Sequence, residues 1–330
     1  MGVREEVLRT LRAAAGGTIS GQALADQLGV SRHAVWKAID KLRSEGYDIQ
    51  ARTNHGYQLV GAADPFSAEG VATFLAPAGV FSLEYHETID STNNRARALA
   101  EAEAPEWTVV LAGRQTAGRG RMGKSFYSPQ AGGIYMSVVV RPQCDVLHAN
   151  MLTIAAAAAV AESIEAVCGV ETQIKWVNDL FVGARKVCGI LTEASVGVEE
   201  QTLRYAVVGI GVNVSPPPGG FPQELSEIAA SIFEAPLDRE VRNRLAAEIL
   251  LRFRAYAEDL LARRYLASYR THFMAFDRRV TLVRGRIREE VVVRDLTEDG
   301  ALVVETDDGQ MKTVASGEMS LRFETKEDVR

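Results

Sequence analysis

The stretch Arg114-Gln-Thr-Ala-Gly-Arg-Gly-Arg-Met-Gly-Lys124 is the most informative part of this chain. It follows an apolar strand predicted over residues 109–112, where ligand-binding loops commonly lie. Its three glycines, at positions 118, 120 and 123, allow backbone N–H groups to approach an anion closely. Arg119, Arg121 and Lys124 place three positive charges within six residues. The stretch therefore predicts a loop that binds phosphate or carboxylate.

The loop matches neither of two common phosphate-binding motifs. A P-loop requires Gly-Lys-Ser or Gly-Lys-Thr at the opening of a helix, and the chain lacks that spacing here. The glycines also do not form a dinucleotide-binding fingerprint. The alternative interpretation is a flexible basic loop without a ligand. Two polar clusters elsewhere in the chain weigh against that alternative.

The first of these clusters, Asp90-Ser-Thr-Asn93, lies at a predicted strand-to-helix junction. Taken alone, its polar residues favour simple capping of a helix expected over 91–104. The second, Lys175-Trp-Val-Asn-Asp179, sets a carboxylate beside an amide, and these ligand types suit Mg²⁺ and phosphate. Its alternative is a polar turn, where Asn-Asp pairs are common. Arg185-Lys186, an apolar strand over 189–191 and Gly209-Ile-Gly-Val-Asn213 follow in order.

The central part of the chain alternates predicted helices with apolar strands. The strands are expected over 109–112, 134–140, 174–176, 189–191 and 206–212. Several of them lack strict alternation of polar and apolar residues, which favours a sheet covered by helices. The helices are expected over 91–104, 148–167 and 239–267.

The first sixty residues predict three helices followed by a hairpin. Ser20 caps the second helix and Ser31 caps the third, which runs to about residue 45. Short strands are expected around 49–51 and 57–59. This pattern is typical of a helix-turn-helix with a wing, in which the last helix enters a major groove. The candidate DNA contacts are Ser31, Arg32, His33, Trp36, Lys37 and Arg52. The alternative is a three-helix module for protein contacts, with these side chains solvated.

The last sixty residues change to an antiparallel β pattern. Short apolar strands are expected over 280–282, 291–293 and 302–304. Asp299-Gly300 and Asp308-Gly309 are strong signals for hairpin turns. The segment therefore predicts a small antiparallel barrel or sandwich.

The composition is that of an ordinary soluble globular chain. It has 330 residues, of which 47% are hydrophobic and 24% charged, and this length suggests two or three domains. Asp64-Pro65 is the expected linker. The expected domains are a winged helix-turn-helix over 1–63, a central domain over 64–272 and a small barrel over 273–330.

No apolar run approaches the roughly 20 residues that span a bilayer, the longest being 154–160, and the N-terminus is too charged for a signal peptide. We therefore expect a cytoplasmic protein. Cys144, Cys168 and Cys188 fit no metal or redox spacing and are expected to be small core residues. The net charge of −6 argues against a protein that coats nucleic acid. Residues 1–60 nevertheless hold eight Lys/Arg and six Asp/Glu, which is compatible with a local DNA-binding face.

Five short motifs occur in order: DSTN at 90–93, GRGR-x-G at 118–123, KW-x-ND at 175–179, K-x-x-GIL at 186–191 and G-x-G-x-N at 209–213. Their order and spacing resemble those of biotin–protein ligases. With its two terminal segments, the chain resembles the bifunctional biotin–protein ligase and biotin operon repressor family over nearly its whole length. The resemblance implies an α+β protein. It would comprise a winged helix-turn-helix, a mixed-sheet α/β domain of the biotin/lipoate ligase type, and an SH3-like barrel.

The activity that this resemblance implies has two steps. The biotin carboxylate attacks the α-phosphorus of MgATP, which releases pyrophosphate and leaves biotinyl-5′-AMP. The ε-amine of one lysine on a biotin carboxyl carrier domain then attacks this anhydride and releases AMP. Neither step needs an enzyme nucleophile, so catalysis would rest on positioning and charge neutralisation. The ligands implied are ATP, Mg²⁺ and biotin. A homodimer promoted by biotinyl-AMP would bind operator DNA and repress transcription.

The resemblance also implies roles for individual residues. The biotin contacts would be Ser91, Thr92, Asn93, Gln115, Gly118, Arg119, Gly120, Arg121, Lys186, Gly189, Gly209 and Gly211. The ATP contacts would be Arg121, Lys124, Phe126, Lys175, Asn178, Asp179 and Asn213. Arg121 and Lys186 would neutralise the carboxylate and the α-phosphate as they meet. Asp179 would help to hold Mg²⁺ through the phosphates and to deprotonate the acceptor lysine.

Three positions depart from the family pattern. Val177 stands where proline is usual, which should loosen a turn slightly. Lys124 stands where arginine is common and exchanges a bidentate fork for a point charge. Phe126 replaces the more usual tryptophan and keeps an aromatic face to cover adenine.

Three competing interpretations stay open at this point. One is a sensor-repressor that binds a small acid without turnover, and another is a lipoate or octanoate transferase of the same fold. The third is a ligase whose helix-turn-helix has no operator activity. The residues that suit ATP speak against a pure sensor, and the GRGR-x-G loop favours biotin over lipoate.

Overall fold

The computed structural model describes residues 2–14, 17–44, 47, 49–52, 56–59, 66–75, 79–142, 145, 149–196, 202–235 and 240–320. The chain divides into two compact units. The first comprises Met1–Gly79 with Ala235–Ala247, and the second comprises Val80–Glu234 with Glu248–Arg330. The domain boundaries expected after residues 63 and 272 stay predictions.

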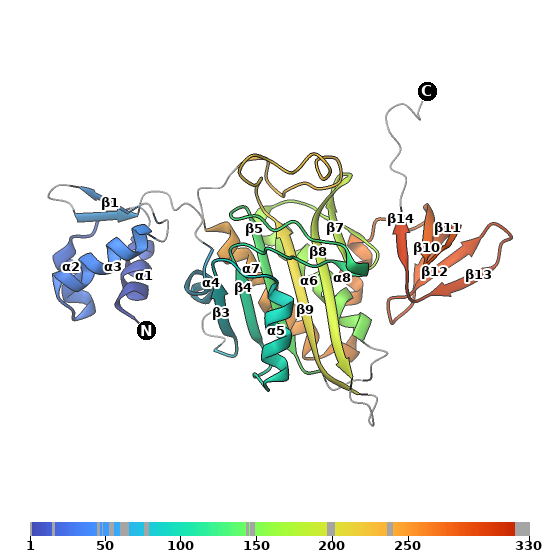
Figure 1. Cartoon of the computed structure of the whole chain (residues 1–330), viewed down its shortest axis with the longest axis horizontal. Coiled ribbons are helices and arrows are strands. Elements are labelled where there is room, and N and C mark those ends of the chain that lie inside the picture. The colour runs from blue at the N-terminus through green and yellow to red at the C-terminus, as the bar shows by residue number, and fades with distance from the viewer. Residues whose placement is uncertain are drawn as a thin grey trace. The chain divides into compact units, whose positions relative to one another are not determined.

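The N-terminal part of the first unit forms three helices and a hairpin (Figure 1). These are α1 (Val3–Ala13), α2 (Gly21–Leu28), α3 (Arg32–Ser44), β1 (Ile49–Arg52) and β2 (Gly56–Leu59), the two strands pairing antiparallel. The apolar side chains that predicted the helices form one buried core, which includes Val7, Leu11, Leu24, Val35 and Ile39. The predicted winged helix-turn-helix is therefore confirmed.

The turn between α2 and α3 has the predicted capping chemistry. The Oγ of Ser20 accepts a hydrogen bond from the backbone N of Ala23 at 3.0 Å, and Ser31 does the same for Ala34 at 3.1 Å. Gly29 ends α2 in the left-handed conformation, with φ of 63°, which costs glycine little. The expected end of α3 at 45–46 and the wing tip at 53–55 lie outside the described residues.

The core of the second unit is a seven-stranded sheet in the order β3-β4-β5-β9-β8-β7-β6. The strands are β3 (Ser82–His86), β4 (Thr108–Ala112), β5 (Gly133–Val140), β6 (Gln173–Lys175), β7 (Asp179–Val182), β8 (Arg185–Val196) and β9 (Leu203–Asn213). β3 and β4 are parallel and the other pairs antiparallel, so the sheet is mixed. Every residue of β4 and β5 is buried, as the lack of alternation predicted.

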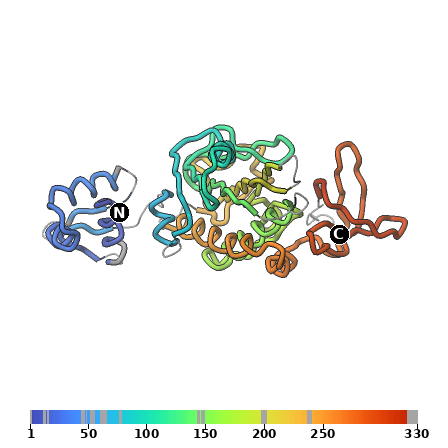
Figure 2. The backbone as a smooth tube through the Cα atoms, turned by 90° about the horizontal axis from the view of Figure 1, so that it is seen from below, coloured from blue at the N-terminus to red at the C-terminus, as the bar shows by residue number. Residues whose placement is uncertain are grey.

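Helices cover both faces of this sheet. Figures 1 and 2 show α5 (Thr92–Glu101) on one face and α6 (Ala149–Cys168) on the other. α6 is long and apolar enough to cross a membrane by length and composition alone, whereas the sequence pattern indicated no such segment. Thirteen of its 20 residues are buried against the protein, which accounts for its apolar composition as a core helix.

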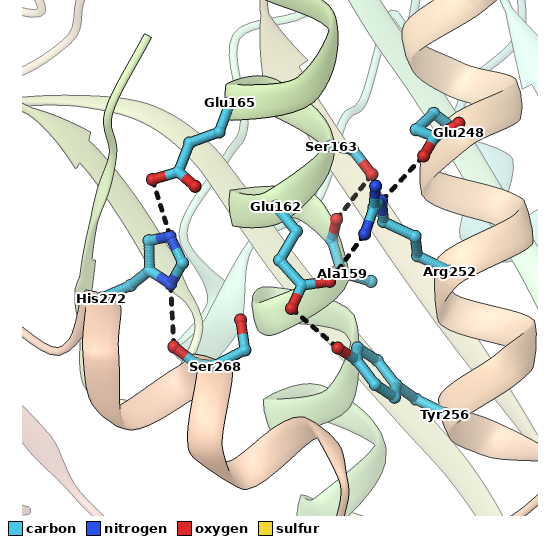
Figure 3. Close-up of polar contacts among 9 residues, drawn as sticks. All are labelled: Ala159, Glu162, Ser163, Glu165, Glu248, Arg252, Tyr256, Ser268 and His272. Atoms are coloured by element: carbon cyan, nitrogen blue, oxygen red, sulfur yellow. Dashed lines mark hydrogen bonds and ion pairs between the residues drawn. The ribbon is translucent and has the colours of Figure 1, made fainter. Parts of the chain in front are cut away.

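Polar contacts outside the sheet link α6 to the helices that follow it (Figure 3). Glu162 accepts hydrogen bonds from the Oη of Tyr256 at 2.8 Å and from Arg252 at 3.1 Å. Burial, together with the bond to Glu162, raises the pKa of Tyr256 to about 12. His272 contacts a carboxylate oxygen of Glu165 at 2.9 Å.

The single helix expected over 239–267 is wrong. The structure has α7 (Val241–Ala257), a short 3-10 turn at Leu260–Ala262 and α8 (Tyr265–His272). Arg263 adopts the left-handed conformation, with φ of 55°, which breaks the helix there. Leu260 and Tyr265 are both buried, so the apolar spacing continues across the break and conceals it in the sequence.

The last part of the chain forms a five-stranded antiparallel sheet in the order β13-β12-β11-β10-β14. Its strands are β10 (Arg279–Arg284), β11 (Ile287–Leu296), β12 (Leu302–Thr306), β13 (Met311–Val314) and β14 (Glu318–Ser320). Gly300 and Gly309 form the two predicted turns at φ of 74° and 79°. The Nε1 of Trp176 donates to the carbonyl of Gly300 at 2.9 Å, so this small domain contacts the KWVND segment directly.

Candidate active site

A small cavity opens among the start of α5, the loop after β4, and strands β8 and β9. It is lined by the predicted biotin residues, Gly118 excepted: Ser91, Thr92, Asn93, Gln115, Arg119, Gly120, Arg121, Lys186, Gly189, Gly209 and Gly211. Residues from four distant segments therefore meet in one place. Their individual roles stay predictions.

The polar end of this first cavity is built from neutral groups. The Oε1 of Gln115 accepts a hydrogen bond from the backbone N of Thr92 at 2.8 Å and lies 3.0 Å from the Oγ1 of Thr92. The Nε2 of Gln115 donates to the Oγ of Ser128 at 2.9 Å. Ser91 stands at the N-cap position of α5 without a side-chain cap bond, so capping does not explain it.

Asn93 is held by protein groups on every side of its amide. Its Oδ1 accepts from the Oγ of Ser137 at 2.6 Å, while its Nδ2 donates to the carbonyl of Leu191 at 3.3 Å and to Glu193 at 2.9 Å. A Cβ built on Gly209 would lie 2.0 Å from the Oδ1 of Asn93. The first glycine of the G-x-G-x-N motif is therefore required by this close approach.

Gly189 and Gly211 also make room for the aromatic ring of Phe126, and Gly118 makes room for its backbone. A Cβ on Gly211 would lie 2.5 Å from the ring of Phe126, and one on Gly189 would lie 3.2 Å from it. A Cβ on Gly118 would lie 2.4 Å from the carbonyl oxygen of Phe126. The ring packs edge-to-face against Tyr135, with centroids 6.4 Å apart.

A second cavity, of about 1790 Å³, lies beside the first and shares its border residues Gly120, Arg121, Phe126, Asn178 and Lys186. At this border Arg121 donates to the Oδ1 of Asn178 at 3.0 Å, and the Nζ of Lys186 pairs with Asp179 at 2.7 Å. Two cations therefore stand where the contents of the two cavities would meet. Phe126 lies on this border too, rather than within the second cavity alone.

The second cavity contains every residue predicted to bind ATP: Arg121, Lys124, Phe126, Lys175, Asn178, Asp179 and Asn213. Lys175 lies 5.7 Å from the ring centre of Phe181, and burial lowers its pKa while the nearby Asp179 opposes that change. Lys124 pairs with both carboxylate oxygens of Glu318, at 2.7 and 2.9 Å. That hydrogen bond lowers the pKa of Glu318. The Trp176–Val177 peptide bond beside the cavity is cis.

Sequence reasoning missed two side chains that support the first cavity and two parts of the second. Ser137 lies in the apolar run of β5 and Glu193 follows Thr192 in β8, and nothing local marks either of them. Glu318 comes from β14, 139 positions beyond Asp179 in the sequence. The segment 221–229 also lines the second cavity, where Lys186 donates through its backbone to Ile228 at 2.9 Å. The sequence signal near that segment was the proline- and glycine-rich loop that precedes it, at 215–220.

The predicted DNA-binding residues form a face of α3 in the first unit. Arg32, His33, Trp36 and Lys37 are exposed there. The rings of His33 and Trp36 stack with centroids 5.8 Å apart, although Trp36 is 51% exposed. Ser31 uses its hydroxyl to cap the helix, and the side chain of Arg52 lies outside the described residues.

Three family models match the chain. The biotin/lipoate A/B protein ligase family matches residues 85–213, an HTH domain matches 3–58, and the biotin protein ligase C terminal domain matches 275–322. The matched segments coincide with the mixed sheet, the winged helix-turn-helix and the C-terminal sheet described above.

Individual relatives agree with the family models. The chain is 34% identical over 326 residues to the bifunctional ligase/repressor BirA of Bacillus subtilis (strain 168), an alignment that covers 97% of this chain and 98% of that protein. It is 29% identical to the bifunctional ligase/repressor BirA of Escherichia coli (strain K12), covering 93% of this chain and 94% of that one. Among solved structures, the biotin protein ligase from Aquifex aeolicus in complex with biotin and ATP superimposes with a TM-score of 0.58. It is 27% identical and covers 73% of this chain and 98% of that chain. This chain therefore belongs to the family of bifunctional biotin ligase/repressors.

Proposed function

We propose that this protein forms biotinyl-5′-AMP from biotin and MgATP and then transfers biotin to one lysine of a biotin carboxyl carrier domain. The observation that carries this proposal is that two cavities share Arg121 and Lys186 at their border. One cavity is small and has neutral polar groups at one end. The other is larger and is lined by four cations and three carboxylates: Arg121, Lys124, Lys175, Lys186, Asp179, Glu227 and Glu318. A carboxylate from the first and a phosphate from the second would meet at Arg121 and Lys186.

The first cavity suits biotin in its chemistry. Biotin has a neutral ureido ring, so it needs neutral partners, which Ser91, Thr92 and Gln115 supply. An unpaired ring nitrogen or oxygen would cost about 1–3 kcal/mol once buried, and the site therefore selects against acids without such a ring.

In the first step a biotin carboxylate oxygen attacks the α-phosphorus of ATP and the P–O bond to pyrophosphate breaks. Arg121 and Lys186 would offset the negative charge that the two reactants bring together. Asp179 is a fitting group for Mg²⁺ carried by ATP, because this ion usually keeps waters and phosphate oxygens and takes one or two carboxylates. Lys186 pairs with Asp179 at 2.7 Å, so the pair would open when the phosphates enter.

In the second step the lysine amine attacks the carbonyl carbon of the adenylate, and the bond to the phosphate oxygen of AMP breaks. The amine must also lose a proton. Asp179 would accept it, because its carboxylate lines the second cavity and pairs with the border residue Lys186. No enzyme nucleophile is required, and positioning supplies most of the rate enhancement.

The test is to incubate the full chain with biotin, MgATP and a biotin carboxyl carrier domain and to measure the mass of the acceptor. A gain of one biotin, dependent on ATP and lost in the Arg121→Ala and Lys186→Ala variants, is the expected result. Biotin binding without a mass change would instead support a sensor without turnover. If lipoate or octanoate competed as strongly as biotin itself, the result would support a lipoate or octanoate transferase.

We also propose that the winged helix-turn-helix binds operator DNA as a homodimer that biotinyl-AMP promotes. The exposed Arg32, His33, Trp36 and Lys37 on α3 support a major-groove contact. A ligand that binds the dimer more tightly than the monomer must favour the dimer. Because ATP, carboxylase and operator meet in the cytoplasm, the protein belongs there.

The DNA test starts from a pool of random duplexes, from which the full chain selects binders in the presence of biotin and ATP. Affinity for the selected duplex is then titrated with and without the two ligands. Tighter binding with both ligands supports repression under biotin control, and equal binding would leave a ligase without that control.

A further inference from the structure

Glu193 of β8 connects the two walls of the first cavity without lining it. Its Oε2 accepts a hydrogen bond from the Nδ2 of Asn93 at 2.9 Å, and its Oε1 pairs with Arg119 at 3.0 Å. It therefore joins the first turn of α5 to the glycine–arginine loop. We propose that Glu193 is a positioning residue for biotin, which fixes the direction of the hydrogen bonds around the first cavity and holds the loop against them. This inference rests on the proposed biotin ligase function.

The direction of these bonds follows from the chemistry of each group. A carboxylate only accepts hydrogen bonds, so Glu193 orients the Nδ2 of Asn93 toward itself and the Oδ1 toward Ser137. An amide oxygen cannot donate, so the single proton of Ser137 goes to Asn93 at 2.6 Å. The hydroxyl of Thr92 then has two acceptors for its one proton, the Oγ of Ser137 at 2.7 Å and the Oε1 of Gln115 at 3.0 Å.

The direction of these hydrogen bonds also determines what Thr92 and Gln115 offer to the ligand. With either acceptor the proton of Thr92 is used within the protein, so its hydroxyl can only accept a hydrogen bond from the ligand. Gln115 keeps the bond from the backbone N of Thr92 at 2.8 Å and the bond to Ser128 at 2.9 Å, and one of its N–H groups remains for the ligand. The charge on Glu193 therefore sets which donors and acceptors biotin meets.

The surroundings leave this chain of bonds little freedom. Thr92, Asn93 and Ser137 are buried, and a Cβ on Gly209 would lie 2.0 Å from the Oδ1 of Asn93. At the other end, Arg119 is also anchored to Asn94 at 3.0 Å, so the loop retains one anchor on α5 when Glu193 is removed.

The test compares Glu193→Ala, Glu193→Gln and Glu193→Asp with the wild-type chain. Pyrophosphate release is followed while biotin and ATP are varied separately, and biotin binding is measured by calorimetry. Glu193→Ala should raise the KM and the Kd for biotin about 10- to 100-fold and leave the KM for ATP within about twofold. Glu193→Gln keeps an acceptor for Asn93 but loses the ion pair, so its effect should lie between those of alanine and wild type. Glu193→Asp should restore part of the loss.

Glu162→Ala is the matched control. Its carboxylate also pairs with an arginine, at 3.1 Å, and accepts a second hydrogen bond at 2.8 Å (Figure 3). The two glutamate side chains are similarly exposed, at 22% for Glu162 and 25% for Glu193, and Glu162 lines neither cavity. This control should lower the melting temperature and leave the KM for biotin unchanged.

Several outcomes would overturn the inference. These are an unchanged KM for biotin in Glu193→Ala, an equal rise in the KM for ATP, or the same loss of biotin affinity in Glu162→Ala. A wild-type chain that fails to bind biotin would instead overturn the proposed function, and the inference with it.

Discussion

Arg121 lines both cavities, and its guanidinium contacts two protein groups. It donates to Asn178 at 3.0 Å and reaches the carbonyl of Gly317 at 3.5 Å. Both partners are neutral, and no carboxylate of the described residues forms an ion pair with Arg121. Lys186, by contrast, pairs with Asp179. We therefore predict that Arg121 is the more available of these two cations for the adenylate.

Arg121→Gly should loosen the hold on biotinyl-AMP, because the charge that bridges its carbonyl and phosphate groups is lost. The escaping anhydride then reacts with any lysine. We expect biotin on an unrelated lysine-rich protein in the same tube to increase at least about tenfold, which corresponds to about 1.4 kcal/mol of lost binding. Mass spectrometry of both proteins measures it.

The control for this experiment is Arg185→Ala. Arg185 is exposed, next to Lys186 in the sequence, and lines neither cavity, so this variant should modify the carrier lysine alone. An Arg121→Gly variant with the wild-type pattern of modified lysines would remove Arg121 from its proposed role.

Gly209→Ala tests the packing that holds Asn93. The new methyl group would lie 2.0 Å from the Oδ1 of Asn93, so Asn93 must move and leave Ser137 without its acceptor. A buried group left unpaired costs about 1–3 kcal/mol, and the KM for biotin should rise roughly 5- to 150-fold. Steady-state kinetics with biotin varied measure the change. Gly79→Ala is the control, since a Cβ there meets nothing within 4 Å. Equal kinetics for the two variants would contradict the packing argument.

At the element scale, α3 combines a buried face with an exposed aromatic one. Val35 and Ile39 anchor it in the core of the winged helix-turn-helix, whereas Trp36 and His33 stack on the outer face. A tryptophan that is 51% exposed contributes little to the core. Its apolar ring is suited to the methyl group of thymine in a major groove.

Trp36→Ala should therefore weaken binding to the selected duplex by about 1–3 kcal/mol, which is roughly 5- to 150-fold. Biotin transfer should stay at the wild-type rate. Fluorescence anisotropy with labelled duplex measures the affinity. Met311→Ala, which removes another exposed apolar side chain in the C-terminal sheet, should change neither property. A Trp36→Ala variant with undiminished DNA affinity would show that the exposed ring serves another contact.

At the scale of the whole molecule, the two cavities depend on segments from most of the second unit. The loop after β4 is held to β14 by the pair between Lys124 and Glu318, and β14 itself contributes to the second cavity. Trp176 ties the KWVND segment to the β11–β12 turn through Gly300. Ligands that bridge the cavities therefore stabilise the sheet and the C-terminal domain together.

Biotin with a non-hydrolysable ATP analogue should raise the melting temperature of the full chain. At about one hundred times Kd, binding adds about 2.7 kcal/mol, and a unit of this size gains roughly 2–4 °C for each kcal/mol. We expect a rise of roughly 5–10 °C by scanning calorimetry. The Arg121→Ala, Lys186→Ala double variant should show no such rise, and Glu162→Ala should start lower but rise equally. An equal rise in the double variant would contradict the shared border.

The sequence by itself determined the order of the parts and predicted which residues carry the chemistry. Helix caps at Ser20 and Ser31, hairpin glycines at 300 and 309, and the apolar runs of β4 and β5 are local signals, because each depends on neighbours a few positions away. The five motifs identified the family from the sequence because each of them is also a short local pattern. Breaks such as that at Arg263 were hidden, since the apolar spacing continues through them. β3, β7 and α4 (Ala68–Leu75) were missed because such short elements carry little periodicity.

Only the tertiary structure decided which residues support the motifs. Glu193 lies 100 positions beyond Asn93 in the sequence and Ser137 lies 44 beyond it, yet all three share one hydrogen-bonded chain. Their meeting depends on the register of β5, β8 and β9 in the sheet, where Gly209 pairs with both Ser137 and Leu191. Register is a long-range property, because a slip of one residue would turn the side chains of Ser137 and Glu193 to the opposite face of the sheet.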